Sequence, residues 1–457
     1  MVSSILVFGA SGDLTSRYLM PAFARLEHDG LIPANLDIVG IDRKDWSRDR
    51  FLDHIGAKLE AHADDIEGRS RTALLSRLDY RRADVARPEE VAAAVGTPSA
   101  PVVSYLALPP ALFAPSIRAL RAADLPDGSV VVVEKPFGED ESSARELNEL
   151  LHESFPERCV FRVDHFLHEQ TVQNILGIRF ANRLFEPLWS ARDIDAVDIV
   201  WDETLGLENR ASYYDSAGAL KDMIQNHLLQ LLCLVAMERP AALNEKEVRN
   251  RKVDLLRAIR RPAADEVEND TVRARYVEGV VDGRKIPSYV DEPSVDAAKG
   301  TETFAQVVLR IDNERWSGVP FTLRSGKALA RNRRQISIRL KPTPLPLFHE
   351  SPEAPPNVLY FDVEPDAMGL QVNINGPGDP FDLERADLTT SLAPQELPAY
   401  ARLVMKTLEG DPILAIRGDE AEEAWRVVDP ILEAWRDNRV PLREYPAGSG
   451  GPPMESA

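Results

Sequence analysis

The chain has 457 residues, of which 44% are hydrophobic and 28% are charged, and its formal net charge is -20 at pH 7. Because single hydrophobic cores stop growing near roughly 250–300 residues, we expect two domains. The negative charge would repel nucleic acids and anionic membrane surfaces, so neither is expected as a partner. An anionic ligand must therefore be held by a local group of basic side chains.

The N-terminus and the cysteines indicate a cytoplasmic protein. Residues 1–8 lack the basic start and long apolar run of a signal peptide. No apolar run reaches the roughly eighteen residues that a membrane span needs. The only cysteines, Cys159 and Cys233, lie among apolar residues, which is typical of buried reduced thiols. Without a cluster of cysteines and histidines, we expect no metal site.

Short apolar runs alternate with helical stretches in the first third of the chain. The predicted strands are 5–8, 36–39, 102–106 and 130–133. This alternation predicts an α/β Rossmann-type domain over residues 1–170, with a doubly wound parallel sheet that would bind a dinucleotide. Such a sheet binds its ligand at the carboxyl ends of the strands.

Residues 171–447 are expected to form a larger α+β domain for substrate binding and dimerisation. Several runs between 302 and 375 alternate apolar and polar residues, which predicts an antiparallel sheet with one covered face. The predicted elements are helices within 171–237, 397–409 and 419–436, and strands at 196–201, 304–311, 335–340 and 358–363. Residues 448–457 are rich in glycine and proline and are expected to form a flexible tail.

A glycine-containing motif, Gly-Ala-Ser-Gly-Asp-Leu at residues 9–14, follows the first strand and opens a helix. Glycines let the backbone approach a pyrophosphate, whose charge is met by amides at the helix N-terminus. Ser11 and Leu14 stand where the full dinucleotide pattern has glycine, so an ordinary turn is the alternative. The candidate coenzyme-binding residues of this motif are Gly9, Ser11, Gly12, Asp13 and Leu14.

The second strand is followed by Asp42 and Arg43, which give opposite signals about the coenzyme. An arginine at this position can pair with the 2′-phosphate of NADP, whereas an inward-facing aspartate would repel it. Asp42 could equally cap the next helix and face solvent. Residues 15 and 16, Thr-Ser, add no positive charge near the motif. We therefore expect use of NADP with appreciable tolerance of NAD.

Two further motifs carry residues suited to sugar chemistry. Lys135 ends a buried strand and is followed by proline, so it is expected at the ligand edge, where it could hold a hydroxyl or the coenzyme. A solvated surface lysine is the alternative. His227 lies on a predicted helix whose Asp222, Asn226 and Gln230 share one face. A lone histidine on such a helix is more often a core residue, unless a carboxylate orients it as a base.

Taken in order, these motifs resemble the glucose-6-phosphate dehydrogenase family. The matching segments are 9–14, 105–110, 134–138, 162–165, 222–230 and 323–329. The resemblance implies oxidation of glucose 6-phosphate at C1, giving 6-phosphoglucono-δ-lactone and NADPH at the entry to the pentose phosphate pathway. It also implies a dimer formed through the antiparallel sheet, so we expect a homodimer or homotetramer.

The resemblance also implies roles for individual residues. His227 would be the general base at the C1 hydroxyl, and Asp164 would orient it. Sugar hydroxyls would be bound by Lys135, Glu203 and Asp222, with Lys135 also near the nicotinamide. The phosphate would be addressed by His165 and Lys327. The reaction requires no metal.

One segment departs from the family pattern. After Asp164 and His165 the family continues Tyr-Leu-Gly-Lys-Glu, whereas residues 166–170 here are Phe-Leu-His-Glu-Gln. A tyrosine hydroxyl and a lysine that bind phosphate are therefore absent, and Glu169 adds a negative charge. A charged hydrogen bond contributes about 1.5–3 kcal/mol, so the missing lysine alone should cost roughly ten- to a hundredfold in affinity.

Three explanations of this departure are open. His168 could turn towards the phosphate, an arginine of the run 331–334 could reach it, or the substrate could lack the phosphate. The last would make the protein a related sugar C1-dehydrogenase. A binding homologue without catalysis is a further alternative, but it would have no physical reason to keep Asp164 and His227.

Overall fold

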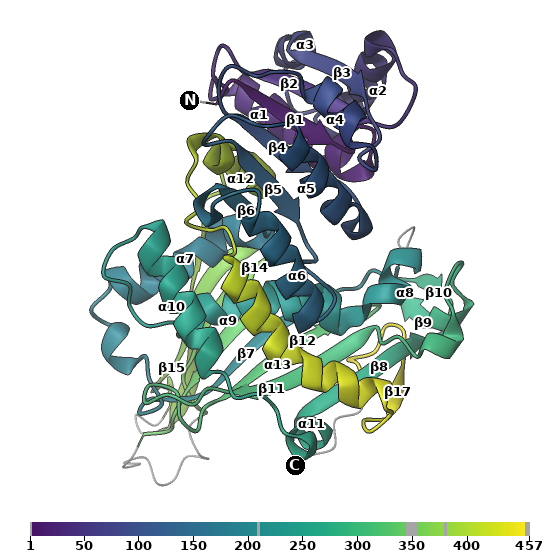
Figure 1. Cartoon of the computed structure of the whole chain (residues 1–457). Helices are drawn as coiled ribbons and strands as arrows, with labels where there is room; N and C mark the ends of the chain where they lie inside the picture. Colours follow the sequence, from purple (N-terminus) through teal and green to yellow (C-terminus); the bar gives the residue numbers. More distant parts are fainter. Residues whose placement is uncertain (1, 208–210, 344–354, 379–381, 453–457) are drawn as a thin grey trace. The chain divides into compact units, whose positions relative to one another are not determined.

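The computed structural model describes residues 2–207, 211–343, 355–378 and 382–452 (Figure 1). They form two compact units. The first comprises Met1–Glu169, Pro240–Asn250 and Gln395–Glu422; the second comprises Gln170–Arg239, Arg251–Pro394 and Glu423–Ala457. The chain thus first changes unit after Glu169, close to the expected boundary at 170. The expectation of one uninterrupted second domain did not include the two later segments that join the first unit.

The first unit is built on a six-stranded, wholly parallel sheet with the order β3-β2-β1-β4-β5-β6. Its strands are β1 (Ser4–Phe8), β2 (Asp37–Asp42), β3 (Leu78–Arg82), β4 (Val102–Leu106), β5 (Val130–Glu134) and β6 (Val160–Val163). This order belongs to Rossmann folds, in which the winding direction reverses between β1 and β4. The predicted fold class is confirmed, and β3 and β6 are additional strands that the sequence pattern did not reveal.

Helices flank this sheet (Figure 1). They are η1 (Thr15–Leu19, a π-helix), α1 (Met20–His28), α2 (Arg48–His62), α3 (Gly68–Ser76), α4 (Pro88–Val95), α5 (Phe113–Ala122), α6 (Glu141–His152) and α12 (Ala399–Glu409), with the short 3₁₀ turn η4 (His165–His168). The α6 helix begins with a reciprocal cap between Asp140 and Ser143. Strands β4 and β5 are buried along their whole length, so the core runs through the middle of the sheet.

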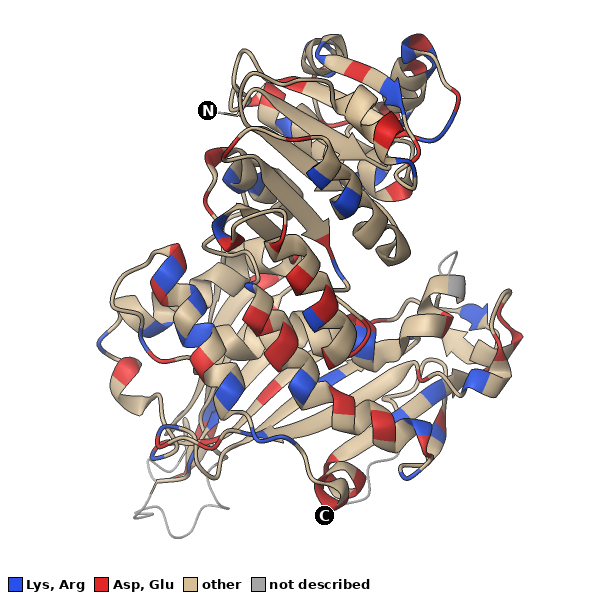
Figure 2. Cartoon of the chain, viewed as in Figure 1, with Lys and Arg blue, Asp and Glu red and all other residues tan. Residues whose placement is uncertain are grey.

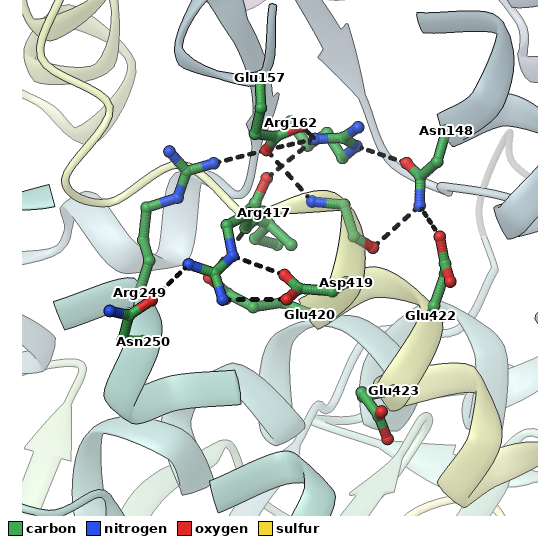
Figure 3. A network of polar contacts seen from close by, with 12 residues as sticks. Asn148, Glu157, Arg162, Arg249, Asn250, Arg417, Asp419, Glu420, Glu422 and Glu423 are labelled. Atoms are coloured by element: carbon green, nitrogen blue, oxygen red, sulfur yellow. Dashed lines mark hydrogen bonds and ion pairs between the residues drawn. The ribbon is translucent and has the colours of Figure 1, made fainter. Parts of the chain in front are cut away.

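A network of charged and polar side chains ties the later segments to β6 (Figure 3). The fully buried Arg162 donates from Nη1 to both oxygens of Glu157, at 3.0 and 3.1 Å, and from Nε to Asn148, at 3.0 Å. Glu157 also accepts from Arg249 at 2.7 Å and from the backbone N–H of Gly418 at 3.2 Å. The Glu157 carboxylate therefore accepts hydrogen bonds from three parts of the first unit that are far apart in sequence.

We predict that Glu157→Ala lowers the melting temperature by about 5–15 °C. Removing one partner of a buried ion pair costs about 3–5 kcal/mol, because it leaves an uncompensated buried charge. Glu153→Ala is the matched control, since Glu153 pairs with Arg121 and both side chains are more than half exposed. The control should shift the melting temperature only slightly. Equal shifts in a thermal scan of both variants would contradict the account of this network.

The second unit is built on a nine-stranded mixed sheet with the order β16-β15-β14-β13-β7-β12-β11-β8-β17. Its strands are β7 (Ile194–Asp202), β8 (Thr271–Val277), β11 (Phe304–Arg310), β12 (Pro320–Gly326), β13 (Arg333–Leu340), β14 (Val358–Val363), β15 (Asp366–Asn375), β16 (Leu383–Ser391) and β17 (Leu442–Pro446). Most neighbours are antiparallel, as predicted, but β7 pairs with β12 in parallel and β17 pairs with β8 in parallel. A separate hairpin is formed by β9 (Gly279–Val281) and β10 (Arg284–Ile286).

Helices accompany this sheet (Figure 1). They are α7 (Gln170–Ala181), α8 (Ala211–Ala219), η7 (Leu220–Leu228, a π-helix), α9 (Leu229–Ala236), α11 (Ala264–Asp270) and the greater part of α10 (Glu245–Ala258) and α13 (Gly418–Arg436). Among the described helices, none has the length and apolar character that crossing a membrane requires.

The expected flexible tail does not begin at Gly448. The backbone N–H of Gly448 donates to Ala328, and Ser449 accepts from Ala330, both at 2.8 Å. Arg324 also donates to the carbonyl of Gly450 at 2.8 Å. These bonds fix residues 448–450 to the second unit, whereas residues 453–457 lie outside the described residues.

Candidate active site

The glycine-containing loop lies where the winding of the first sheet reverses. Gly9 has a φ of +82°, and a Cβ there would lie 3.0 Å from the carbonyl carbon of Ala107. Its N–H donates to Ile41 at 2.9 Å, and its carbonyl accepts from the Thr15 hydroxyl at 3.0 Å. The loop is therefore held between the carboxyl ends of β2 and β4. This is the place where Rossmann folds bind a pyrophosphate, so the residues present fit a dinucleotide.

Asp42 holds this loop from the end of β2. Its carboxylate accepts from the Ser11 N–H at 3.0 Å, from the Ser11 hydroxyl at 2.7 Å and from the Lys44 N–H at 3.2 Å. The following helix is instead capped by Ser47, which accepts from the Arg50 N–H. The interpretation of Asp42 as a solvent-facing helix cap is therefore wrong. The carboxylate faces the loop because two donors of Ser11 lie within hydrogen-bonding distance.

The other residues of the loop are more exposed. Gly12 is partly buried, and its carbonyl accepts from the Ser16 N–H at 3.0 Å as the helix begins. Asp13 is exposed and forms an ion pair with Arg17 at 3.7 Å. Leu14 packs against the core of the first unit. Arg17 is thus partly neutralised, which leaves little positive charge in the loop itself.

Exposed cations surround the end of β2. Lys44 and Arg50 lie over the ring of Trp46, 4.6 and 5.2 Å from its centroid. Arg43 is exposed, and its carbonyl accepts from the guanidinium of Arg82 at 3.4 Å. Elsewhere Figure 2 shows basic residues interspersed with acidic ones along the chain. An anionic group on the adenosine would therefore be attracted by this local cluster and not by a basic face.

The ends of β5 and β6 carry the candidate residues Lys135 and Asp164. Glu134, the last residue of β5, is buried and accepts from the Tyr105 hydroxyl at 2.6 Å. Burial raises the pKa of Glu134 to about 7, although the Tyr105 hydrogen bond and the Lys135 charge act in the opposite direction. Asp164 is buried as well and accepts from the Phe166 N–H at 3.0 Å, which caps η4. Because β5 and β6 are parallel neighbours, Lys135 and Asp164 lie at the same edge of the sheet.

The segment that departs from the family pattern is largely buried. The ring of His165 stacks on Tyr400, with centroids 5.1 Å apart, and contacts the buried Phe166 edge-on at 4.9 Å. His168 is only 4% exposed, and this burial lowers its pKa to about 4 despite the charge of Asp164. His168 is therefore neutral near pH 7. A neutral imidazole can still donate a hydrogen bond, so the hypothesis that His168 turns towards a phosphate stays a prediction.

The second unit brings together Glu203 and Lys327. They follow directly on β7 and β12, whose parallel pairing places both residues at one edge of the sheet. The Lys327 ammonium lies 2.5 Å from one Glu203 oxygen, and the Arg334 guanidinium lies 3.6 Å from the other. Arg334 also pairs with Glu364. These two cations are thus already balanced by carboxylates.

The other described residues of the run 331–334 do not gather around Lys327 to form a phosphate site. Asn332 accepts from the Thr204 N–H at 2.8 Å, so its amide supports the backbone after β7. Arg333 donates to Gln335 at 3.1 Å, and Arg331 is exposed. Within the run 331–334, Arg334 contacts the candidate substrate residue Glu203.

Asp222 and His227 lie on η7, which is a π-helix and not the α-helix that the sequence pattern predicted. Both side chains are buried, and Asp222 accepts from the Tyr213 hydroxyl at 3.2 Å. At about 100° per residue, an α-helix would place residues five apart roughly 140° from each other. A π-helix bonds i to i+5, which brings them to adjacent positions. The helix type therefore puts Asp222 and His227 on one face.

The candidate residues fall into two groups, one in each unit. The first unit carries the coenzyme loop, Arg43, Lys135, Asp164 and His165, and the second carries Glu203, Asp222, His227 and Lys327. Residues that sequence reasoning did not single out are Tyr105, Tyr213, Glu134 and Tyr400. Tyr105 and Glu134 lie within quoted motifs and could have been found there, whereas Tyr400 is more than two hundred residues from His165 and carried no local signal.

The sequence matches two protein-family domains. They are the NAD binding domain of glucose-6-phosphate dehydrogenase, over residues 6–174, and the C-terminal domain of the same family, over residues 176–457. The chain belongs to the glucose-6-phosphate dehydrogenase family. This confirms the resemblance stated from the motifs.

Full-length relatives agree with this assignment. The chain is 40% identical to glucose-6-phosphate 1-dehydrogenase of Gluconobacter oxydans over 98% of this chain and 94% of the relative. It is 39% identical to the protein of that name from Mycolicibacterium smegmatis, with the same coverage. A solved glucose-6-phosphate dehydrogenase in complex with glucose 6-phosphate superposes with a TM-score of 0.89 at 30% identity, covering 99% of this chain and 96% of that chain.

We predict that Gly9→Ala weakens NADPH binding at least tenfold, measured by NADPH fluorescence. The added methyl group would meet the Ala107 carbonyl, and φ of +82° is strained for alanine, so the loop must shift. Gly30→Ala is the matched control, because Gly30 has a φ of +68° but open space around its Cβ position. An unchanged affinity in Gly9→Ala would contradict the role of the loop.

Proposed function

We propose that the chain oxidises D-glucose 6-phosphate at C1 to 6-phosphoglucono-δ-lactone, with NADP as hydride acceptor. The full-length similarity to enzymes of this name supports the reaction. The observation that carries the proposal is the buried His227 beside Asp222 on the π-helix, because proton removal from a sugar hydroxyl needs a base beside a group that holds the sugar.

In this mechanism His227 accepts the proton of the C1 hydroxyl. Removing the proton as the hydride leaves avoids a build-up of positive charge on C1, and an imidazole can accept it near neutral pH. Asp164 is assigned to orient the imidazole and to stabilise its protonated form, as carboxylates do for histidine bases elsewhere. The bound nicotinamide supplies the hydride acceptor.

The sugar hydroxyls are assigned to Lys135, Glu203 and Asp222. Hydrogen bonds from several fixed groups restrict the pyranose to a reactive orientation. The Tyr213 hydroxyl supports this assignment by holding the Asp222 carboxylate. Lys327 holds the Glu203 carboxylate in the same way. A sugar hydroxyl that binds Glu203 would meet a carboxylate whose orientation is already fixed, and it would compete with Lys327 for that carboxylate.

The phosphate is assigned to His165 and Lys327. Three observations oppose tight phosphate binding: Phe166 has no hydroxyl, His168 is neutral and Lys327 is paired with Glu203. The same observations favour a second candidate function, a sugar C1-dehydrogenase that does not demand the 6-phosphate. The retention of Asp164 and His227 argues against a homologue without catalysis.

NADP is the proposed coenzyme, with NAD also accepted. The exposed Arg43, Lys44 and Arg50 support binding of a 2′-phosphate at the end of β2. Asp42 opposes it, but its charge is partly compensated by the hydrogen bonds from Ser11 and the Lys44 N–H. A 2′-phosphate and a ribose hydroxyl can therefore both be accommodated.

We further propose that the enzyme works in the cytoplasm, at the entry to the pentose phosphate pathway, as a homodimer or homotetramer. A polar pocket on the large sheet supports association through that sheet. Its lining includes Arg333, Gln335, Ser337, Tyr360, Asp362 and Gln371. These side chains bond to one another, as in the Gln335–Asp362 and Tyr360–Asp387 pairs, so strands β13, β14 and β15 present a preorganised polar face for a second copy of the sheet.

We predict NADPH formation from glucose 6-phosphate that falls by about 10²–10⁴-fold in kcat in His227→Asn, because this is the contribution of a general base. His62→Asn is the matched control, since His62 is exposed at the end of α2. Initial rates with each coenzyme test the NADP proposal in the same assay. Full activity of His227→Asn would contradict the assigned base, and activity with NAD alone would contradict the coenzyme.

A further inference from the structure

A buried carboxylate stands at the beginning of the π-helix that carries Asp222 and His227. Glu302 is 8% exposed, and its Oε1 accepts from the Leu220 N–H at 3.0 Å. Its backbone carbonyl accepts from the Ala219 N–H at 3.2 Å. The first amides of a helix have no partner within the helix, so an outside acceptor is needed when they are buried. Glu302 supplies two such acceptors from a segment 82 residues away.

The backbone before the π-helix is shaped to admit Glu302. Gly218 interrupts α8 with a φ of 69° and a ψ of 173°, which lie outside the helical region. A Cβ at this position would lie 2.8 Å from the carboxyl carbon of Glu302. Glycine is therefore required twice here, for its left-handed φ and for the space that the carboxylate fills.

The residue after Glu302 supports the other side of the sugar site. The carbonyl of Thr303 accepts from the Lys327 N–H at 3.0 Å. The hydroxyl of Tyr445 donates to the Lys327 carbonyl at 2.6 Å, and it lies 3.0 Å from the Thr303 hydroxyl. Two consecutive residues thus contact both the helix of the assigned base and the backbone of Lys327.

Burying a carboxylate at this position costs free energy. Burial raises the pKa of Glu302 to about 7, although the hydrogen bond from the Leu220 N–H and, to a smaller extent, the charges of Arg273 and Lys221 act in the opposite direction. Burial raises the pKa of the Tyr214 hydroxyl well above its usual value, and the charges of Asp222 and Glu302 add to this shift. An ordinary core position would favour an apolar residue, because a buried charge must be compensated. What Glu302 contributes at this position is therefore a hydrogen-bond acceptor for the start of the π-helix.

We propose that Glu302 is a positioning residue that fixes the start of the π-helix and thereby the placement of Asp222 and His227 against the sugar. The inference rests on the proposed function, because the placement matters only if these residues act on the substrate. Glu302 acts through the helix and need not touch the sugar. A displacement of about 1 Å at reacting groups can cost roughly a hundredfold in rate.

The test compares Glu302→Ala, Glu302→Gln and the control Glu268→Ala, which removes an exposed glutamate of α11. The measurements are kcat and KM for glucose 6-phosphate and the Kd of NADPH. We expect Glu302→Ala to lower kcat about 10- to 100-fold with the NADPH Kd within about twofold of wild type. Glu302→Gln should recover kcat to within about threefold, because its amide oxygen accepts the same hydrogen bond.

A second variant guards against a general loss of folding. Gly218→Ala should lower kcat by itself, because the methyl group displaces the carboxylate. In the double variant Gly218→Ala/Glu302→Ala the obstructing side chain is gone and only the strain of the left-handed φ at residue 218 remains, so the two effects should be clearly less than additive. Additive effects would overturn the inference, as would an NADPH Kd that weakens in parallel with kcat.

The outcomes separate the inference from the proposed function. A wild type that forms no NADPH from glucose 6-phosphate overturns the proposed function and the inference with it. An active wild type with an unchanged kcat in Glu302→Ala overturns the inference alone.

Discussion

Parallel strand pairing is the constraint on which the candidate site depends, because it brings the residues that follow neighbouring strands to one edge of a sheet. In the first unit this pairing aligns the coenzyme loop after β1 with Lys135 after β5 and Asp164 after β6. In the second unit the sheet is mostly antiparallel, yet β7 and β12 run in parallel and place Glu203 beside Lys327. The same geometric rule therefore assembles both groups of residues.

Carboxylates at the site are oriented by donors from elsewhere in the chain. Asp42 is held by Ser11, Glu203 by Lys327, Asp222 by Tyr213, and Glu302 by the start of the π-helix. A buried carboxylate is costly unless it is hydrogen bonded, so each contact restricts the position of a charge. In a chain with a net charge of -20, such local pairing decides where an anionic substrate or coenzyme can approach.

Much of the fold could be predicted from local sequence. The runs at β1, β2, β4 and β5 are short, apolar and rich in valine, isoleucine or leucine, and motifs beside them gave the coenzyme loop and Lys135. β3 was missed because Leu78–Arg82 carries three charged residues. β6 was missed because its buried Arg162 depends on the Glu157 carboxylate, which Arg249 from a distant segment also binds.

The geometry of the site was less predictable, because it rests on contacts between distant residues. The inward orientation of Asp42 depends on Ser11, 31 residues away. The π-helical path from Leu220 replaces the predicted α-helix, and Glu302 meets its first amide from 82 residues away. The burial of His168 follows from the packing of η4, which no periodicity in residues 165–168 reveals. The assigned roles of the catalytic and substrate-binding residues remain predictions.

Recognition of the phosphate is where the chain departs from the family pattern, since Phe166 and Glu169 replace a tyrosine and a lysine. The most direct test is the ratio of kcat/KM for glucose 6-phosphate to that for glucose. The account predicts a preference for the phosphorylated sugar of about a hundredfold or more, because two charged hydrogen bonds contribute about 3–6 kcal/mol. Equal use of the two sugars would contradict it and establish a sugar dehydrogenase that does not read the phosphate.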